Sequence, residues 1–373
     1  MALTERAWVE INLKILEENF LNLKNLVGVG VKVVPVIKAN AYGHGVLKVA
    51  DKLVAMGADM LALATLSEAV FVRQSGINVP ILILGGCPDG QELLAVTNDI
   101  TPAIFTEKSL ARLSKAAIKL RKTIKYHIKI DTGLSRLGIQ PEELLNFLER
   151  GQALNGVALE GIFSHFSVAD QPEEKDFTED QLEIFNHTIK KAESAGFDIK
   201  YKHIANSAGT IFNPDSWLDL VRTGISLYGV NPSSQLDTSL IKPVLSLKTR
   251  VLLLKTLPKG RSIGYGRKFS TSRRSTIATI GIGYADGVSR LLSNKGKVII
   301  RGQYAPIIGN ISMDLITIDV TGIPSVSIND EVIIIGNDGE SKITVWDLAN
   351  LIGTIPYEVL TSIGSRVERV YLS

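Results

Sequence analysis

The sequence is poor in cysteine: Cys87 is the single thiol in 373 residues. One thiol excludes both an intrachain disulfide and a cysteine metal cluster. Cys87 directly follows Gly85 and Gly86, so we expect a small loop or core residue at this position. We expect no bound metal.

Long hydrophobic runs and an excess of charge of one sign are also absent. Apolar runs such as residues 332–335 are far too short to span a bilayer. The formal net charge is +3, and no run of lysines and arginines has aromatic residues interleaved, which disfavours nucleic acid and membrane surfaces as partners. Polar and charged residues at positions 4–6 come too early for the apolar core of a signal peptide. We therefore expect a cytoplasmic protein.

The composition is that of a soluble globular protein, with 45% hydrophobic and 21% charged residues. A chain of 373 residues is too long for one ordinary core, so two domains are expected. The pattern of the sequence changes after about residue 231, from alternating strand-like and helix-like segments to mainly strand-like segments. We therefore predict an N-terminal domain of residues 1–236 and a C-terminal domain of residues 237–373.

Short apolar, β-branched segments alternate with helix-period segments through the first two thirds of the chain. The eight predicted strands are residues 33–37, 60–64, 80–84, 102–105, 126–130, 158–163, 199–204 and 218–221. The helices predicted between them are residues 47–56, 66–74, 107–122, 141–150 and 178–195. Each helix is long enough to connect parallel strands. The count is that of a (β/α)₈ TIM barrel, and a doubly wound open sheet is the alternative that strand counting leaves open.

The last third of the chain reads as mainly β. Turn signals separate its apolar segments, and one stretch, residues 344–351, has helical character. The predicted strands are residues 243–257, 275–280, 298–301, 305–308, 315–320 and 331–335. The expected architecture is therefore a barrel followed by a β domain.

Lys38 is the most informative residue, because it ends the apolar run of residues 33–37 and precedes the loop of residues 39–45. A lysine at the end of a buried strand is costly unless its amine has a task there. Burial lowers a lysine pKa toward neutrality, which suits a Schiff-base former or a proton carrier. The structural alternative is a lysine whose charged end reaches the surface.

Polar residues also follow the later predicted strands, where barrel loops converge on one rim. Each has a structural interpretation by itself, such as a helix cap at Asn206 or an ion-paired Arg222. Together they favour a site, and the last two loops have the small, donor-rich character of a barrel phosphate site. The residues are Lys129 and Arg136 after the fifth strand, His165 after the sixth, Asn206 and Ser207 after the seventh, and Arg222, Gly224 and Ile225 at the eighth.

Several segments resemble the alanine racemase family. Residues 36–45, Val-Ile-Lys-Ala-Asn-Ala-Tyr-Gly-His-Gly, resemble its pyridoxal-phosphate lysine motif, and residues 129–138 resemble its Lys-x-Asp-Thr-Gly-Met-x-Arg segment. Further matches follow in the family's order over nearly the whole chain, at residues 161–166, 203–208, 222–229, 264–266, 283–287, 312–314, 357–358 and 366. The family has a (β/α)₈ barrel and a C-terminal β domain, in agreement with the strand prediction.

The resemblance implies a pyridoxal 5'-phosphate enzyme that racemises alanine with two bases. Lys38 would hold the cofactor covalently and act on one face of the α-carbon, while Tyr265 of a second subunit acts on the opposite face. The expected assembly is a homodimer with shared active sites. A tyrosine with its ordinary pKa near ~10 needs polar neighbours to act as a base, and the family places His165 and Arg222 there. Arg222 would also face the pyridine nitrogen and leave the ring a weaker electron sink.

The resemblance also assigns the residues that bind cofactor and substrate. Arg136 and the backbone amide of Met313 would bind the substrate carboxylate. Lys129 lies close to Arg136 in the family and is often carbamylated there, which would turn a cation into an anion that orients Arg136. Besides Lys38, His165 and Arg222, the cofactor would be bound by Tyr42, Asn206, Ser207, Gly224, Ile225 and Tyr284.

Two residues near the substrate pocket depart from the family pattern. Leu134 stands where many members have methionine, and Ser312 where many have cysteine. We expect these differences to bear on fine substrate preference and inhibitor chemistry rather than on the reaction type. A serine or broad-specificity racemase of the same fold is the nearest alternative. A decarboxylase is less favoured because Ser312 replaces the cysteine that those enzymes use, and a non-catalytic carrier of the cofactor lacks the second domain. An alanine racemase would supply D-alanine for peptidoglycan synthesis.

Overall fold

The chain folds into two compact units in the computed structural model, which describes residues 5–373. The barrel unit consists of residues 16–41 and 46–242; the β unit consists of residues up to 15, 42–45 and 243–373. We expected residues 1–236 to form one domain, whereas residues 5–15 and 42–45 group with the C-terminal part. Residue 4, which supported the expectation about a signal peptide, lies outside the described residues.

The barrel unit, all of whose residues are described, is built on eight parallel strands. Strands β3 to β8 form one sheet in sequence order, and β9 pairs with β2. Hydrogen bonds from Ile37 N to Ala62 O (2.9 Å) and from Arg222 N to Ala205 O (3.1 Å) link β2 to β3 and β9 to β8. This cyclic order confirms the eight predicted strands and the (β/α)₈ barrel. The strands are β2 (Lys32–Pro35), β3 (Leu61–Leu63), β4 (Ile81–Ile83), β5 (Ile100–Ile104), β6 (Ile124–Lys129), β7 (Val157–Phe163), β8 (Tyr201–His203) and β9 (Leu220–Thr223).

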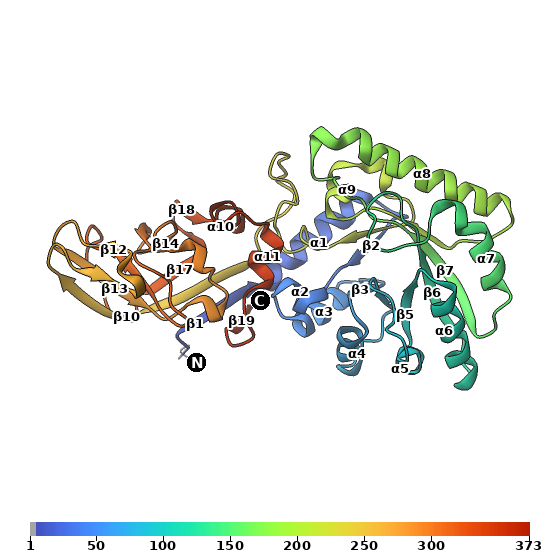
Figure 1. The fold of residues 1–373 in the computed structure, drawn as a ribbon, viewed down its shortest axis with the longest axis horizontal. Helices are drawn as coiled ribbons and strands as arrows, with labels where there is room; N and C mark the ends of the chain where they lie inside the picture. Colours follow the sequence, from blue (N-terminus) through green and yellow to red (C-terminus); the bar gives the residue numbers. More distant parts are fainter. Residues whose placement is uncertain (1–4) are drawn as a thin grey trace. The chain divides into compact units, whose positions relative to one another are not determined.

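Helices connect consecutive strands of the barrel unit and cover them from outside (Figure 1). Five of them confirm the predicted helices, and α1, α2, α5 and α9 have no predicted counterpart. None of the helices formed by residues 5–373 is both long and apolar enough to cross a membrane. The helices are α1 (Leu13–Val27), α2 (Lys38–Tyr42), α3 (Val46–Ala55), α4 (Leu66–Gln74), α5 (Glu92–Thr97), α6 (Glu107–Lys119), α7 (Leu144–Gln152), α8 (Lys175–Ser194), α9 (Ser207–Phe212), and the 3₁₀ turns η1 (Pro141–Glu143), η2 (Pro172–Glu174) and η3 (Pro214–Ser216).

Apolar periodicity explains the packing of the barrel unit. Every residue of β3 and β4 is buried, as expected for parallel strands that are covered on both faces. Helix α6 buries Leu110, Leu113 and Ala117, which lie on one face at helical spacing. Its first turn is capped by Thr106, whose side chain accepts a hydrogen bond from Ser109 N (3.2 Å). These contacts hold the strand ends, and therefore the residues that follow them, in fixed positions.

The β unit contains, within its described residues, a nine-stranded sheet and a separate two-stranded hairpin. The sheet order is β15-β14-β17-β10-β1-β19, with β13 on β10, β16 on β13 and β18 on β17. The predicted strands of the last third are confirmed, as is the predicted helix, which is α10. The elements are β1 (Ala7–Asn12), β10 (Leu245–Leu257), β11 (Ser262–Ile263), η4 (Tyr265–Arg267), β12 (Phe269–Ser270), β13 (Ser275–Ile280), η5 (Tyr284–Asp286), η6 (Arg290–Leu292), β14 (Lys297–Ile300), β15 (Gln303–Pro306), β16 (Ile316–Asp319), β17 (Glu331–Asp338), β18 (Ser341–Ile343), α10 (Val345–Ile352), α11 (Pro356–Thr361) and β19 (Glu368–Leu372).

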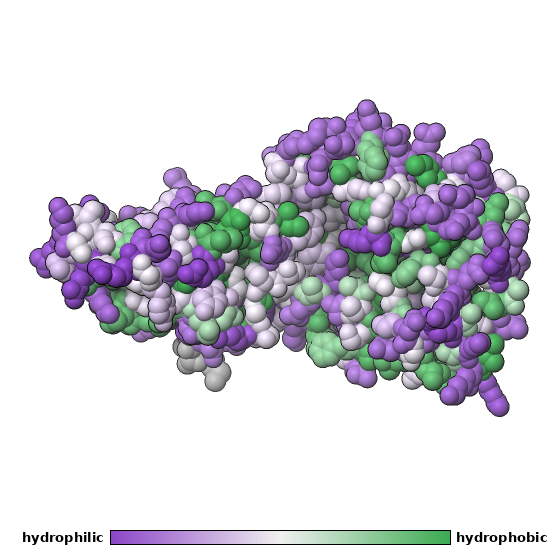
Figure 2. Space-filling model, viewed as in Figure 1, coloured by the Kyte–Doolittle hydropathy of each residue, from purple (hydrophilic) through white to green (hydrophobic). Residues whose placement is uncertain are grey.

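Strand β1 explains why the chain start belongs to the β unit. It pairs antiparallel with β10 and parallel with β19. None of β1, β19 and α11 has a predicted counterpart. For β1 and β19 the reason is that these short strands have their partners far away in the sequence. The visible surface of both units is mainly hydrophilic, with separate hydrophobic groups (Figure 2).

Candidate active site

Lys38 stands at the start of an unusual turn. Ala39, Asn40, Ala41 and Tyr42 all have φ between +51° and +55°, which is the left-handed region. That region costs a residue with a side chain roughly 1–2 kcal/mol, so other contacts must hold this turn. The positive φ values begin at Ala39, four residues before Gly43, the first glycine of the loop.

Two side chains hold the left-handed turn. The Glu68 carboxylate accepts hydrogen bonds from Ala39 N (2.6 Å) and Thr65 N (3.2 Å). The Asn40 side chain accepts one from Val46 N (2.8 Å) at the start of α3. Glu68 is also the N3 residue of the capping box of α4. The Thr-x-x-Glu signature of that box is visible in the sequence, although its link to the lysine loop is not.

The surroundings of Lys38 favour its uncharged form. Burial lowers the pKa of the Lys38 amine, the positive charge of Arg136 lowers it further, and Glu68 acts in the opposite direction. An amine with a lowered pKa is a better nucleophile and proton acceptor at neutral pH. The lowered pKa of this half-buried side chain does not fit the structural alternative, a lysine whose charged end reaches the surface.

Lys129, at the end of β6, is a second buried lysine on the same rim. Its Nζ lies 5.5 Å from the centre of the Phe163 ring. Burial lowers the pKa of Lys129 to about 8, with further contributions from Arg222 and Arg136. The loop that carries Arg136 is closed by Asp131, whose side chain accepts hydrogen bonds from two backbone amides of the loop (3.0 and 2.9 Å).

Arg222, on β9, is 2% exposed and lies at the centre of the polar groups in the barrel unit. It donates to His203 Nδ1 (2.5 Å), His165 Nδ1 (3.1 Å), Ser164 O (2.8 Å) and Ile204 O (3.0 Å). None of these partners is a carboxylate. Burial lowers the pKa of Arg222 to about 9. We expected an ion pair as the structural interpretation of Arg222, and its hydrogen bonds do not fit that interpretation.

His165 is a neutral histidine with a defined tautomer. Burial and then the charge of Arg222 lower the pKa of its ring well below the ordinary value. An arginine only donates, so Nδ1 of His165 accepts and the ring proton lies on Nε2. His165 therefore offers one N–H group to a further acceptor.

The loops after β8 and β9 form a small polar cradle. The Ser207 hydroxyl accepts hydrogen bonds from Gly224 N (2.9 Å), Ser226 N (3.3 Å) and Ser226 Oγ (3.0 Å). The Thr223 hydroxyl is buried and has no hydrogen-bond partner in the described part of the chain. The Asn206 side chain accepts from Gly209 N (3.0 Å) and caps α9, which is its structural interpretation.

Three further predicted site residues lie in the β unit and are exposed there. The exposed fractions are 75% for Tyr265, 52% for Met313 and 43% for Tyr284. Tyr265 follows Gly264, whose φ of +72° suits a glycine, and Asn310 Nδ2 donates to the Tyr265 carbonyl (2.7 Å). In the same unit the Tyr42 ring lies 6.1 Å from the Tyr357 ring, and burial raises the pKa of Tyr42, with Tyr357 adding to the shift.

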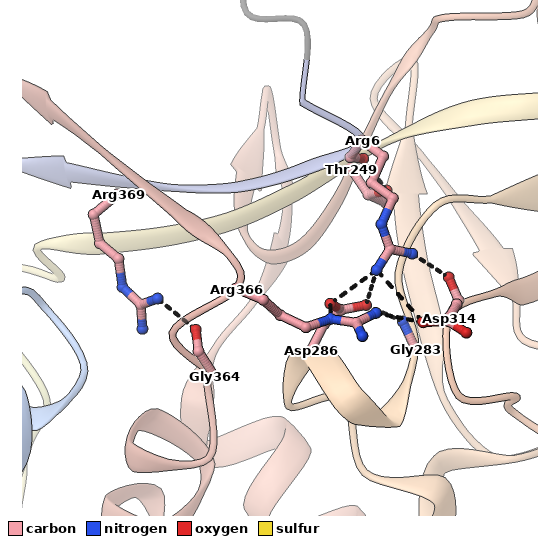
Figure 3. A network of polar contacts seen from close by, with 8 residues as sticks. All are labelled: Arg6, Thr249, Gly283, Asp286, Asp314, Gly364, Arg366 and Arg369. Atoms are coloured by element: carbon pink, nitrogen blue, oxygen red, sulfur yellow. Dashed lines mark hydrogen bonds and ion pairs between the residues drawn. The ribbon is translucent and has the colours of Figure 1, made fainter.

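A buried carboxylate, Asp286, lies in a network of polar contacts that also contains Gly283 and Asp314 (Figure 3). It is 1% exposed and accepts from Arg6 Nη2 (3.1 Å), Arg366 Nε (2.6 Å) and Gly283 N (2.9 Å). Both arginines also contact Asp314.

The backbones of the loops that carry Tyr284 and Met313 also meet directly. Tyr284 N donates to Ser312 O (3.1 Å) and Ala285 N to Met313 O (3.0 Å). A side chain at Gly283 would collide with the Met313 carbonyl. Tyr284 and the backbone of Met313 are therefore held as one piece.

The structure brings Lys38, Lys129, Arg136 and Arg222 close enough to His165 that, besides burial, the charge of each lowers the pKa of its ring. Tyr42, Tyr265, Tyr284 and Met313 belong to the β unit. The residues present fit a phosphate-bearing aldehyde such as pyridoxal phosphate. Such a group needs an amine for attachment and hydrogen-bond donors for its phosphate, and the lysine turn and the cradle with its unpartnered Thr223 hydroxyl supply both.

Comparison with known proteins gives matches over both units. The family profile "Alanine racemase, N-terminal domain" matches residues 11–232, and "Alanine racemase, C-terminal domain" matches residues 244–371. An alanine racemase of Halothermothrix orenii is 42% identical over 370 residues, which cover 99% of this chain and 97% of the relative.

Solved structures give the same result. An alanine racemase of Clostridium difficile 630 has a TM-score of 0.94 and 38% identity, with 99% of this chain and 96% of that chain covered. An alanine racemase of Bartonella henselae with covalently bound pyridoxal phosphate has a TM-score of 0.87 and 30% identity, with 99% of this chain and 100% of that chain covered.

Proposed function

The chain belongs to the alanine racemase family, and we propose that its two units supply the two bases that racemisation requires. The enzyme interconverts L-alanine and D-alanine. A proton must leave the α-carbon on one face and return on the other, so each face needs a group that carries a proton. We assign Lys38 of the barrel unit to one face and Tyr265 of the β unit to the other.

The proposed cofactor is pyridoxal 5'-phosphate, attached to Lys38. The relative from Bartonella henselae holds this group covalently, and the lowered pKa of Lys38 suits attachment. When bound, the cofactor withdraws electrons from the substrate and makes the α-proton more acidic. Its ring nitrogen is assigned to Arg222. The residues assigned to its phosphate and the rest of the cofactor are Tyr42, His165, Asn206, Ser207, Gly224, Ile225 and Tyr284.

Tyr265 is assigned to the site of a second copy of the chain. Tyr265 is 75% exposed within its own chain, which suits a residue that enters the active site of a partner subunit. Leu252, in the middle of β10, and Leu315, next to β16, are exposed apolar side chains. Each follows or precedes a residue that pairs with Ile280 of β13. Exposed apolar groups of this kind favour an interface. The proposed assembly is a homodimer in which each barrel unit meets the β unit of the partner.

His165 is proposed to hold Tyr265 of the partner subunit. Its Nδ1 accepts from Arg222 (3.1 Å), so its Nε2–H can donate to the phenolate oxygen. A hydrogen bond to the charged form of tyrosine lowers its pKa and makes it a better base. Arg222, as the cation behind His165, supports the same shift.

The substrate carboxylate is assigned to Arg136 and to the backbone amide of Met313. That amide makes no hydrogen bond to any described residue, and its loop is held by the backbone hydrogen bonds from Tyr284 N and Ala285 N. Lys129 is proposed to be carbamylated, since burial leaves its amine with a pKa of about 8. The resulting anion would pair with Arg136 and orient it.

A serine or broad-specificity racemase is not favoured, because the relatives over the full chain carry the name alanine racemase. We propose a cytoplasmic location and a role of the product, D-alanine, in peptidoglycan synthesis. The observation that carries the proposed mechanism is the group of Lys38, Lys129 and Arg222 around a neutral His165.

The mechanism is tested with L- and D-alanine in heavy water. The Y265F variant should retain the yellow colour of the bound cofactor and exchange the α-proton of one enantiomer far faster than that of the other. Wild-type enzyme should exchange both. A Y265F variant that racemises both enantiomers at the wild-type rate would overturn the assignment of the second base.

A further inference from the structure

A line of buried side chains connects Arg222 to a carboxylate inside the barrel unit. Nη1 of Arg222 lies 2.5 Å from Nδ1 of His203, and Nε2 of His203 lies 2.9 Å from Nδ1 of His127. Nε2 of His127 lies 3.5 Å from Oε2 of Glu160, a little beyond ordinary hydrogen-bond length. Both histidines and Glu160 are buried. We call these four residues the Arg222–Glu160 chain.

The direction of every contact in the Arg222–Glu160 chain follows from its first member. A guanidinium only donates, so Nδ1 of His203 accepts. Burial lowers the pKa values of His203 and His127, so each ring is neutral and carries one proton. The proton of His203 is then on Nε2 and is donated to His127 Nδ1. The proton of His127 is on Nε2 and faces Glu160.

The Arg222–Glu160 chain ends in an ionised carboxylate, that of Glu160. Burial raises the pKa of Glu160, but contacts with His127 and Lys125 outweigh burial and lower it to about 2. Lys125 Nζ donates to Oε1 of Glu160 (2.8 Å). Oε2 of Glu160 and Nε2 of His127, 3.5 Å apart, are buried and have no other hydrogen-bond partner among the described residues. An ionised carboxylate only accepts. Glu160 therefore selects the same tautomers as Arg222 does, from the opposite end.

The opposite tautomers would put two donors face to face. If Nδ1 of His203 carried the proton, it would point at the N–H groups of Arg222, and the buried guanidinium would lose a partner. A buried donor without an acceptor is costly. The position of Arg222 thus depends on the tautomer of His203, which depends on that of His127.

We propose that Glu160 is a positioning residue that fixes Arg222 through the tautomers of His127 and His203. The effect of Glu160 on the reaction rests on the proposed function, in which Arg222 faces the cofactor. Glu160 itself touches neither the cofactor nor the substrate in that assignment. Its effect is transmitted by proton positions alone.

The variant E160Q tests this inference because Lys125 constrains how a glutamine can lie. The hydrogen bond from the cationic Lys125 is charge-assisted and stronger than one from a neutral imidazole, so the amide oxygen is drawn to Lys125 and the amide N–H₂ faces His127. His127 must then accept at Nε2, which reverses both histidine tautomers. When an amide replaces a carboxylate that accepts from a histidine, the histidine changes its tautomer while the surrounding geometry is kept. The matched control is E92Q, since Glu92 is also buried and accepts from Arg112 Nε (2.6 Å) without contact to the histidines.

Nitrogen-15 NMR of the holoenzyme reads the tautomers directly. The chain has five histidines, and the variants H127Q and H203Q assign the two signals. Wild-type and E92Q enzyme should show His127 and His203 protonated at Nε2, and E160Q should show both protonated at Nδ1. Protonation of either ring at Nδ1 in the wild type overturns the inference, even if E160Q does not fold. Unchanged tautomers in a folded E160Q overturn it as well.

Kinetics separate this inference from the proposed function. E160Q should lower kcat about tenfold, at the lower end of what residues behind functional side chains contribute, with KM changed less than about twofold. E92Q should leave both unchanged. If E160Q showed reversed tautomers and an unchanged kcat, the role of Glu160 in the Arg222–Glu160 chain would be confirmed. The assignment of Arg222 to the cofactor would then be overturned.

Discussion

The barrel unit and the β unit present their functional side chains in different ways. In the barrel unit, Lys38, Lys129 and Arg222 are at least half-buried cations whose pKa values are lowered by burial. In the β unit, Tyr265 and Met313 are mostly exposed, on loops. The barrel residues are thus tuned by burial within one chain, whereas Tyr265 and Met313 are open to the barrel unit of a partner chain in the proposed assembly.

The two units also hold these side chains by different means. Strand ends and hydrogen bonds to buried neighbours fix the barrel residues, as the contacts of Arg222 show. A single buried carboxylate, Asp286, ties together the loops of the β unit (Figure 3). Changes in the barrel unit should therefore alter chemistry first, and changes around Asp286 should alter loop structure and stability first.

The largest effect is expected for K38A. Removal of the amine should abolish covalent attachment of the cofactor and lower racemisation on the order of 10⁴-fold, because one proton carrier is lost together with the attachment point. Absorbance of the purified protein and racemase assays measure both effects. The variant K108A, at an exposed lysine of α6, is the control. Substantial racemisation by K38A would contradict the assignment.

The next effect is expected for D286N and concerns stability. The buried side chain would lose acceptors for Arg6 and Gly283 N, so the free energy of unfolding should fall by about 2 kcal/mol. Denaturant unfolding of the full chain measures the change, with D51N at an exposed position as control. If D286N were as stable as D51N, the network would not hold the loops.

A smaller effect is expected for E68Q. The negative charge of Glu68 raises the pKa of Lys38, so its removal should lower that pKa further. Attachment of pyridoxal phosphate requires the uncharged amine, and its pH dependence, followed by absorbance, should move to lower pH. E107Q, at an exposed glutamate of α6, should leave the profile unchanged. A shift to higher pH would rule out this role of Glu68.

The last and smallest expected effect is the addition of carbon dioxide to the amine of Lys129. Its pKa is lowered to about 8, so carbon dioxide should react with its uncharged amine increasingly as the pH rises through that value. Carbon-13 NMR with labelled bicarbonate should show a carbamate that is absent from K129A. Lys125 should not react, because its hydrogen bond to Glu160 raises its pKa. Electron density that ends at Nζ of Lys129 would contradict carbamylation.

The sequence predicts the strand ends of the barrel unit well because the parallel barrel places them on one rim. Lys38, His165 and Arg222 were predicted on that basis, and the structure brings them together. The left-handed turn was not predictable, since it depends on Glu68, 29 residues from Ala39. The contact of His127 with His203 spans 76 residues. Strand β1 likewise depends on β10 and β19.

The central claim is that one active site combines Lys38 of one chain with Tyr265 of another. Mixing K38A and Y265F chains during refolding tests it, because a mixed dimer with shared sites contains one intact site. Random pairing makes half of the dimers mixed, so about a quarter of the wild-type activity should return. If Lys38 and Tyr265 of the same chain formed each site, no intact site would arise, and activity that stays at the level of the separate variants would contradict the account.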